Sequence, residues 1–271
     1  MLAIGKNSST MASTPRLLLE ERRRRILEMM TGAGRVTVAD IVRELGVSAV
    51  TARTDLNALS SKGLLVRSHG GALTPQEPTK DYPVSYKAIL HHSEKVRIGR
   101  AAAELVQPGE TIILDNGTTT LEVARHLKAL KIQGLTVITN ALNIATELAD
   151  CPDLVLIMVG GLMRQISYSF VGPQAEAMLS QLHADRLFLA VDGFTLDTGP
   201  STPDVLEAHL NERMMDAARE TTIVADSSKL GRRSVSSIGS IQRVQRLITD
   251  SKAPEEFLES VRGLGIAVVV V

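Results

Sequence analysis

The sequence is poor in residues that several classes of protein require. Its 271 residues include one cysteine, Cys151, so no internal disulfide can form and the chain suits a reducing compartment. Aromatic residues make up 3% of the chain and tryptophan is absent, which argues against base-stacking surfaces for single-stranded nucleic acid. No apolar run approaches the ~20 residues of a membrane span, and the N-terminus lacks a signal-peptide core. We expect a cytoplasmic protein with no membrane partner.

The formal net charge is zero, but the basic residues are unevenly distributed. Residues 16–75 hold ten lysines and arginines against six acidic residues, an excess of four positive charges. A basic module attached to a larger, mildly acidic remainder indicates a polyanionic partner for that module. The length allows one small and one larger domain, and 44% hydrophobic residues can form a substantial core.

Two short amphipathic helices are expected between residues 37 and 63. Thr37 and Asp40 have the spacing of a capping pair for the first helix, and Gly46 can end it in a left-handed conformation. Ser48 can cap the second helix. Helices joined by only three residues form a helix-turn-helix. A generic small helical bundle is the alternative.

The second of these helices is the expected DNA-reading element, because a recognition helix places its N-terminal residues nearest the bases of the major groove. Arg53 is the strongest base-reading candidate, since arginine can bond guanine bidentately. A two-stranded wing should follow, turning at Gly70 and Gly71. The arginine run at 22–25 is interpreted as a solvated helix face. The predicted DNA-binding residues are Ser48, Ala49, Thr51, Arg53, Thr54, Asn57, Arg67 and His69.

Residues 21–73 resemble the N-terminal domain of DeoR-type bacterial transcription regulators. The segments ERRRRIL and VTVADIVRELGVSAVTARTDLNALSSKGLLVRSHGGAL carry the resemblance. The family's recognition helix usually reads Thr-Ile-Arg-Arg-Asp-Leu, whereas residues 51–56 read Thr-Ala-Arg-Thr-Asp-Leu. Thr54 therefore replaces an arginine, which should weaken phosphate attraction or change the base preference.

The remainder of the chain alternates apolar runs with helical patterns. Seven runs are expected as strands, at 111–114, 135–139, 154–160, 186–191, 221–226, 245–250 and 265–271. This alternation predicts a doubly wound α/β domain with a mostly parallel sheet covered on both faces. The expected organisation is a disordered arm (1–15), a winged helix-turn-helix domain (16–74), an extended linker (75–92) and an effector-binding domain (93–271).

Polar residues directly follow five of these strands. In open α/β sheets ligands bind outside the carboxyl ends of the strands, so these residues should converge on one rim. Gly117 and three following threonines at a helix start have the composition of a phosphate-binding loop. Turn-making or capping is the reading that we favour for Thr139 and Asp226. The predicted effector-binding residues are Asp115, Asn116, Gly117, Thr118, Thr119, Thr120, Asn140, Gly160, Gly161, Asp192, Glu207 and Lys229.

Residues 95–250 resemble the C-terminal domain of the same family, whose fold relatives include ribose-phosphate and amino-sugar-phosphate isomerases or deaminases. The motifs LDNGTTT, VITNALNIA, AVDGF and ADSSKLG carry this resemblance, and Arg164 and Ser169 fall where the family has a basic and a small polar residue. The resemblance implies a phosphorylated sugar as effector. We predict no cofactor, metal or catalytic residue.

The expected function is a DNA-binding transcriptional regulator, most often a repressor in this family, of sugar-metabolism genes. Double-stranded operator DNA is the expected partner, and a homo-oligomer, dimer or tetramer, is expected because helix-turn-helix proteins pair on two-fold half-sites. The alternative is a sugar-phosphate isomerase or deaminase with an accessory DNA-binding module. The carboxylates of the rim leave it open, although no acid–base motif with an enforced spacing is visible.

Overall fold

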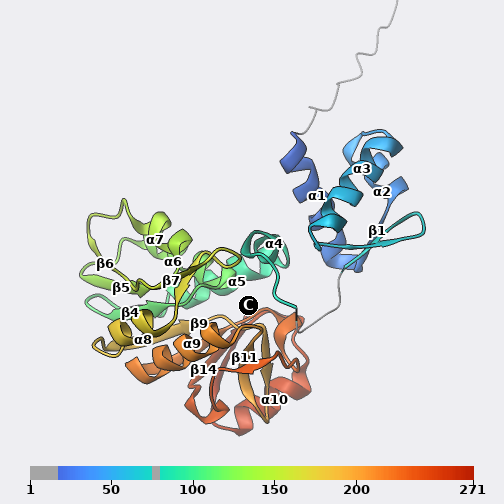
Figure 1. The fold of residues 1–271 in the computed structure, drawn as a ribbon. Helices are drawn as coiled ribbons and strands as arrows, with labels where there is room; N and C mark the ends of the chain where they lie inside the picture. The colour runs from blue at the N-terminus through green and yellow to red at the C-terminus, as the bar shows by residue number, and fades with distance from the viewer. Residues whose placement is uncertain (1–17, 75–79) are drawn as a thin grey trace, which may run out of the picture. The chain divides into compact units, whose positions relative to one another are not determined.

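The chain forms two compact units that divide at Pro75 (Figure 1). The computed structural model describes residues 18–74 and 80–271. The arm expected over residues 1–15 lies outside these described residues, as do residues 75–79 of the expected linker.

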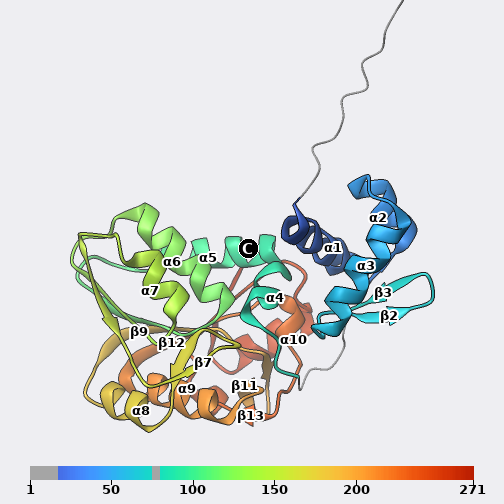
Figure 2. The ribbon, with the colours of Figure 1, turned by 45° about the horizontal axis from the view of Figure 1, so that its top comes forward.

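The first unit is a winged helix-turn-helix, as predicted. Figure 2 shows the hairpin of its wing beside the third helix. Buried side chains of all three helices, such as Ile26, Ile41 and Leu56, form its core. Leu19, the first residue of the first helix, is 47% exposed and lies outside this core. The elements are α1 (Leu19–Ala33), β1 (Arg35–Thr37), α2 (Val38–Leu45), α3 (Ala49–Ser61), β2 (Val66–Ser68) and β3 (Gly71–Leu73).

The helix ends follow the signals in the sequence. Thr37 and Asp40 form a complete capping box at the start of α2. Gly46 ends that helix with a φ of 63°, and the Ser48 hydroxyl accepts a hydrogen bond from the Thr51 N–H at the start of α3. All three local predictions are confirmed.

The wing differs from its prediction in two respects. It turns at residues 69 and 70, because Gly71 already belongs to β3. A third strand, β1, completes an antiparallel sheet of order β1-β3-β2. A Cβ on Gly71 would lie 2.1 Å from the Val36 carbonyl oxygen, so glycine here is what lets β1 approach β3.

The second unit is built on a parallel sheet of seven strands. Each strand predicted from an apolar run is present in it, in the order β15-β14-β12-β9-β4-β5-β6. All six pairings between neighbouring strands are parallel. The strands are β4 (Thr111–Leu114), β5 (Leu135–Thr139), β6 (Leu154–Met158), β9 (Ala184–Leu189), β12 (Ala218–Val224), β14 (Arg246–Thr249) and β15 (Ala267–Val270).

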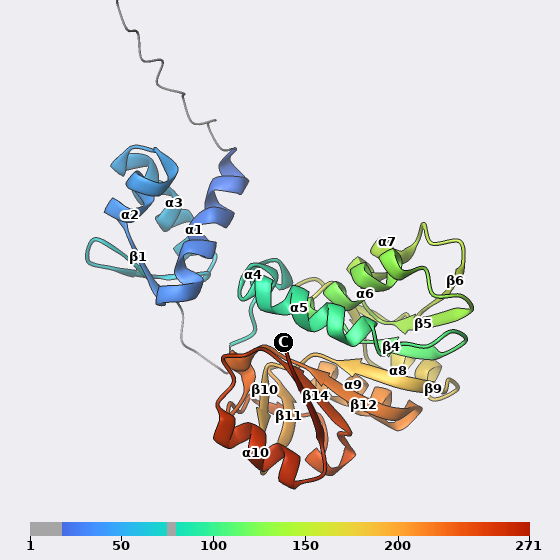
Figure 3. The ribbon, with the colours of Figure 1, turned by 180° about the vertical axis from the view of Figure 1, so that it is seen from behind.

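Helices cover both faces of this sheet, as predicted (Figure 3). Within β4, Ile112 and Leu114 pack into one core while Ile113 packs into the other, which explains why the strand is apolar throughout. Within the described residues no helix combines the length and apolarity that a membrane crossing needs. One face carries α5 (His92–Ala103), α6 (Thr118–Leu130) and α7 (Leu142–Leu148), and the other α8 (Pro173–Leu179), α9 (Val205–Ala217) and α10 (Glu255–Gly263).

Several short elements were not expected. Helix α4 (Val84–Ile89) lies where the sequence suggested an extended linker, and Pro83 stands at its N-cap. Proline disfavours the helical conformation of the residue before it, but proline itself is well tolerated at a helix start. Pro83 can therefore stand at the beginning of α4. The other additions are the hairpin of β7 (Leu162–Arg164) and β8 (Ser169–Val171), the small antiparallel sheet of β10 (Gly193–Thr195), β11 (Gly199–Thr202) and β13 (Ser236–Ser237), and the 3-10 turns η1 (Ser227–Lys229) and η2 (Ile241–Arg243).

Candidate functional sites

The strand order reverses at the centre of the large sheet, and we call the region beyond the carboxyl ends of β4 and β9 the crevice. From β4 the chain adds β5 and β6 on one side, then returns to place β9 on the other side of β4. Ligands bind in open α/β sheets at such a reversal, outside the carboxyl ends of the strands. Residues 115–120 follow β4 and residues 190–192 follow β9, so the predicted phosphate loop lies at this crevice.

Asp115 holds the loop after β4 in shape. Its carboxylate accepts hydrogen bonds from the backbone N–H groups of Gly117 at 3.1 Å and Ala190 at 3.2 Å, and from the Thr120 hydroxyl at 2.8 Å. Burial nevertheless raises the pKa of Asp115 to about 7, although these three bonds favour its charged form. Within the described structure, Asp115 and Thr120 thus bond to the loop itself. Their predicted contact with a ligand stays a prediction.

Gly117 allows α6 to begin against the end of β9. A Cβ at this position would lie 2.1 Å from the Cβ of Ala190. Its φ of −73° is open to any residue, so it is the close approach that requires glycine. The N–H groups of a first helical turn have no partner within the helix, and α6 has no side-chain cap. The backbone at Thr118 and Thr119 therefore offers donors where the helix dipole favours an anion.

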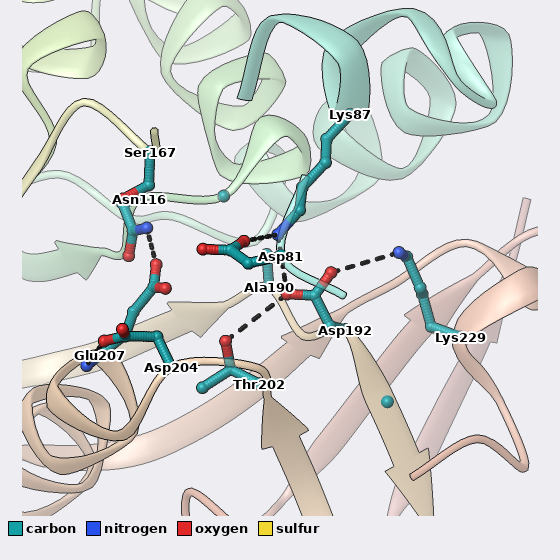
Figure 4. Close-up of polar contacts among 12 residues, drawn as sticks. Asp81, Lys87, Asn116, Ser167, Ala190, Asp192, Thr202, Asp204, Glu207 and Lys229 are labelled. Atoms are coloured by element: carbon teal, nitrogen blue, oxygen red, sulfur yellow. Dashed lines mark hydrogen bonds and ion pairs between the residues drawn. The ribbon is translucent and has the colours of Figure 1, made fainter. Parts of the chain in front are cut away.

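Charged side chains from distant parts of the second unit meet beside this loop (Figure 4). Lys87 of α4 extends toward two carboxylates, with its Nζ 3.0 Å from Asp192 and 3.3 Å from Asp81. Lys229 approaches Asp192 from another side, at 3.4 Å. We call the whole set the ion cluster, and its members are Asp81, Lys87, Arg164, Asp192, Asp204, Glu207 and Lys229.

Arg164 of β7 organises the second half of the ion cluster. Its guanidinium lies 2.5 Å from Asp81, 2.8 Å from Glu207 and 3.3 Å from Asp204. Glu207 also accepts a hydrogen bond from the Asn116 amide, which joins the cluster to the loop after β4. Burial raises the pKa of Glu207 against the opposing effect of the Arg164 charge.

The other half of the cluster is strongly ionic. Burial alone would raise the pKa of Asp192, but Lys87 and Lys229 outweigh it and hold that pKa at about 2. Burial likewise opposes the charge of Lys87, yet Asp192 and Asp81 raise its pKa above the ordinary value. Both groups are therefore charged at neutral pH. In the whole cluster four carboxyl groups face three basic side chains.

Two buried amide oxygens at the carboxyl ends of β4 and β5 lack a hydrogen-bond partner among the described residues. They are the Oδ1 atoms of Asn116, which is 6% exposed, and Asn140, which is fully buried. The Nδ2 of Asn140 donates to the Phe170 carbonyl and so ties β8 to the end of β5. An unpaired buried acceptor is costly, and a ligand hydroxyl would relieve that cost.

Other residues at the strand ends have roles in the fold, with Gly160 as the exception. Gly161 has a φ of 153°, and a Cβ there would lie 2.6 Å from the Val171 carbonyl oxygen, so the β7–β8 hairpin requires glycine. Gly160 has open space around it. The Thr139 hydroxyl accepts from the Ala141 N–H, and the Asp226 carboxylate caps η1, the structural roles favoured for both. The structure brings neither glycine into the ion cluster.

Sequence reasoning left four members of the ion cluster outside the candidate set. Asp81 and Lys87 lie in the segment interpreted as linker, and Arg164 lies on a strand of three residues. Asp204 is the side-chain N-cap of α9, and this capping signal was readable three residues before Glu207. For the other three residues only the assembled fold shows which groups meet.

We predict that Asp115→Asn removes a pH dependence from the stability of the protein. The pKa of Asp115 in the folded chain, about 7, lies above its ordinary value of 3.8. Its contribution to stability is therefore complete below about pH 4 and is lost as the pH rises to about 7. Denaturant titrations should show the wild-type free energy of unfolding falling across this range relative to that of Asp115→Asn. A constant difference between the two proteins would contradict the prediction.

In the first unit, α3 presents an exposed polar face. Arg53, Thr54 and Asn57 are exposed on it, whereas Ala52 and Leu56 are buried, as the periodicity predicted. Arg53 forms no hydrogen bond or ion pair within the described residues. The hydroxyls of Ser48 and Thr51 form a hydrogen bond with each other, and Ala49 between them is partly buried. The Arg67 guanidinium donates to the Gly71 carbonyl, and His69 is exposed in the wing turn.

An ion pair with two arginines attaches this helix to α1. Asp55 is 1% exposed, and its carboxylate lies 2.6 Å from Arg22 Nε and 3.1 Å from Arg23 Nε. The interpretation of the arginine run as a solvated face holds for Arg24 and Arg25 but is wrong for Arg22 and Arg23. Because the buried Asp55 side chain points inward from α3, it binds Arg22 and Arg23.

Known proteins share both units of this chain. Residues 22–77 match the DeoR-like helix-turn-helix domain, and residues 90–251 match the DeoR C-terminal sensor domain. The chain is 40% identical over 253 residues to a protein of Escherichia coli O157:H7 whose name proposes a transcriptional repressor of the aga operon, a match that covers 93% of each chain. It is 34% identical over 253 residues to the HTH-type transcriptional regulator GlpR of Haloferax volcanii, covering 93% of this chain and 98% of that one.

Among solved structures, ribose 5-phosphate isomerase A from Methanocaldococcus jannaschii aligns with a TM-score of 0.39 and 17% identity, over 51% of this chain and 54% of the other. The curated relatives above are named as regulators of transcription, which does not support the enzyme alternative. The winged helix-turn-helix, the α/β unit and the match of both to one family place the chain in the DeoR family of DNA-binding transcriptional regulators.

Proposed function

We propose that this regulator represses genes of sugar metabolism and that a phosphorylated sugar, bound at the crevice of the second unit, controls its binding to operator DNA. One observation carries the choice of effector: the uncapped N-terminus of α6 lies beside the ion cluster. Backbone donors at a helix N-terminus suit a phosphate. Carboxylates and amide oxygens nearby suit the hydroxyl groups of a sugar.

The proposed roles follow from the chemistry of each group. The phosphate takes the N–H groups at Thr118 and Thr119, while Asp192 and the unpaired oxygens of Asn116 and Asn140 accept from sugar hydroxyls. Lys229 adds positive charge beside Asp192. Gly117 permits the approach of the backbone that the phosphate requires.

Control of DNA binding requires that the effector bind two arrangements of the protein with different affinity. An effector with equal affinity for both would shift nothing, however tightly it bound. We expect a homo-oligomer in the cytoplasm, a dimer or tetramer, because one winged unit has few base-reading side chains and two-fold half-sites demand pairing.

A thermal-shift screen of the full chain against sugar phosphates tests the effector class. A phosphorylated sugar at about 100 times its dissociation constant should stabilise the chain by about 2.7 kcal/mol. The matching sugars without phosphate serve as the control for the phosphate contribution. A full panel without a stabilising member would remove the effector half of the proposal.

We predict that Arg53→Ala weakens specific operator binding by about 1–3 kcal/mol, because it deletes the strongest base-reading candidate on the exposed face of α3. Fluorescence anisotropy with operator and scrambled DNA should show the loss on the operator. Arg100→Ala, an equal change of charge at a 64% exposed side chain of α5, is the control. An operator affinity equal to that of Arg100→Ala would show that Arg53 does not read the site. The thermal shift with a sugar phosphate should be unchanged in both variants.

A further inference from the structure

The segment 80–91 joins the ion cluster covalently to the DNA-binding unit. Five residues, 75–79, separate it from Thr74, the last described residue of the first unit. The segment contains α4 and contributes two members of the cluster, Asp81 and Lys87. Any change that frees or holds Asp81 therefore acts seven positions from the end of the DNA-binding unit along the chain.

Polar contacts hold much of this segment in place. Asp81 contacts Arg164 at 2.5 Å, and Lys87 contacts Asp192 at 3.0 Å. The apolar side chains of the segment that are buried are Val84 and Tyr86. Further bonds come from the Val84 N–H to the Ile166 carbonyl at 2.8 Å, and from the buried Lys95 ammonium to the carbonyls of Lys87 and Leu90.

The charge of the cluster makes one carboxylate a competitor of an incoming anion. Asp81 and Asp192 share the cations of the cluster, so a phosphate would compete with these carboxylates for positive charge. Asp192 follows β9, Asp204 caps α9 through the Glu207 N–H at 2.9 Å, and Glu207 lies within α9. Asp81 alone of the four carboxyl groups neither lies in a helix or strand nor directly adjoins one, because α4 begins three residues later. It can leave without breaking a helix or a strand end.

We infer that Asp81 is an internal competitor of the effector's anionic group. Its carboxylate is bound to Arg164 and Lys87, and the negative charge of an effector held at the start of α6 displaces it and releases the segment 80–91. The inference rests on the proposed function and deepens it, because it names the contact whose loss reports an occupied crevice to the DNA-binding unit. It also explains why an anion site in this crevice contains a carboxylate supplied from beside the linker.

Asp81→Ala in the full-length chain tests the inference without knowledge of the effector. The probe is inorganic phosphate, titrated by calorimetry against the wild type and the variant. If Asp81 is bound to Arg164 and Lys87 about nine-tenths of the time, the apparent affinity of the wild type for phosphate is lowered about tenfold. Asp81→Ala should therefore bind phosphate about tenfold more tightly. Without phosphate, amide hydrogen exchange in residues 80–91 should be faster in the variant, and phosphate should speed this exchange in the wild type.

The controls separate competition from a general loss of structure. Asp81→Glu should restore wild-type phosphate affinity and exchange, and Asp81→Asn should behave as Asp81→Ala. Asp153→Ala removes an exposed aspartate elsewhere in the same unit and should change neither. A residue that only supports the fold would weaken phosphate binding when removed, so weaker or equal phosphate binding by Asp81→Ala overturns the inference, as does unchanged exchange in residues 80–91.

These results are distinct from a failure of the proposed function. If the wild type is stabilised by a sugar phosphate while Asp81→Ala matches it in phosphate affinity and exchange, the effector proposal stands and the competition is wrong. If no sugar phosphate stabilises the wild type, the proposed function fails, whereas tighter phosphate binding and faster exchange in Asp81→Ala would still support the competition.

Discussion

Gly117→Ala should abolish the thermal shift with a phosphorylated sugar and lower the free energy of unfolding of the second unit by about 1–3 kcal/mol, the usual cost of overpacking. The added Cβ would lie 2.1 Å from the Cβ of Ala190 and 3.1 Å from the Asp115 carboxylate. The start of α6 must then move away from the end of β9. That movement displaces the N–H groups proposed to hold the phosphate, so binding should suffer more than stability.

Two variants make this result specific. Gly263→Ala adds the same methyl group at a glycine of α10 with no atom within 4 Å of the new Cβ, and it should leave binding unchanged without lowering stability. The double variant Gly117→Ala with Ala190→Gly removes the clashing atom and should recover much of the response. Failure of this rescue, with Gly117→Ala still folded, would mean that close approach to Ala190 is not the reason for glycine.

Asp55→Ala should destabilise the DNA-binding unit by about 3 kcal/mol, because it removes one partner from a buried group of charges. The carboxylate joins Arg22 and Arg23 of α1 to α3, and both arginine side chains are at most 16% exposed. Without it, Arg22 loses its carboxylate, Arg23 keeps only the more distant Glu20 at 3.7 Å, and the exposed face of α3 loses its anchor. Operator binding should therefore weaken as well, although Asp55 itself is buried.

Thermal unfolding and operator titration measure the two effects separately. Glu44→Ala removes an acidic side chain that is 56% exposed on the neighbouring helix α2, and it should change the stability of the unit by less than about 0.5 kcal/mol. Because both single changes raise the net charge equally, a general electrostatic effect on DNA would appear in both. An equal melting temperature for Asp55→Ala and the wild type would show that the pair does not anchor α3.

Much of the architecture could be read along the chain because its causes are local. The capping box of Thr37 and Asp40, the left-handed Gly46 and the N-cap Ser48 each act within a few residues. The seven strands of the large sheet were visible because each contains an apolar run, and a central strand such as β4, which packs into both cores, is apolar on both faces. The phosphate loop was visible because a strand end, a glycine and a helix start stand in sequence.

The shorter elements escaped prediction for a related reason. Strands such as β1, β7 and β8 have three residues each, too few to show a period. Helix α4 has six residues and begins at a proline-bearing stretch with the composition of a linker. Hydrogen bonds to remote partners, such as that from the Val84 N–H to the Ile166 carbonyl, hold these elements, and no local pattern encodes them.

The sequence by itself determined that the chain carries a winged helix-turn-helix followed by a doubly wound α/β unit, because periodicity, capping and turn chemistry depend on near neighbours. Only the tertiary structure decided which charges meet. Asp81 and Lys87, Arg164, and Asp192 come from three separate segments, which meet where the winding of the sheet reverses. Coulombic attraction acts through space rather than along the chain, so the ion cluster appears only once the fold is assembled.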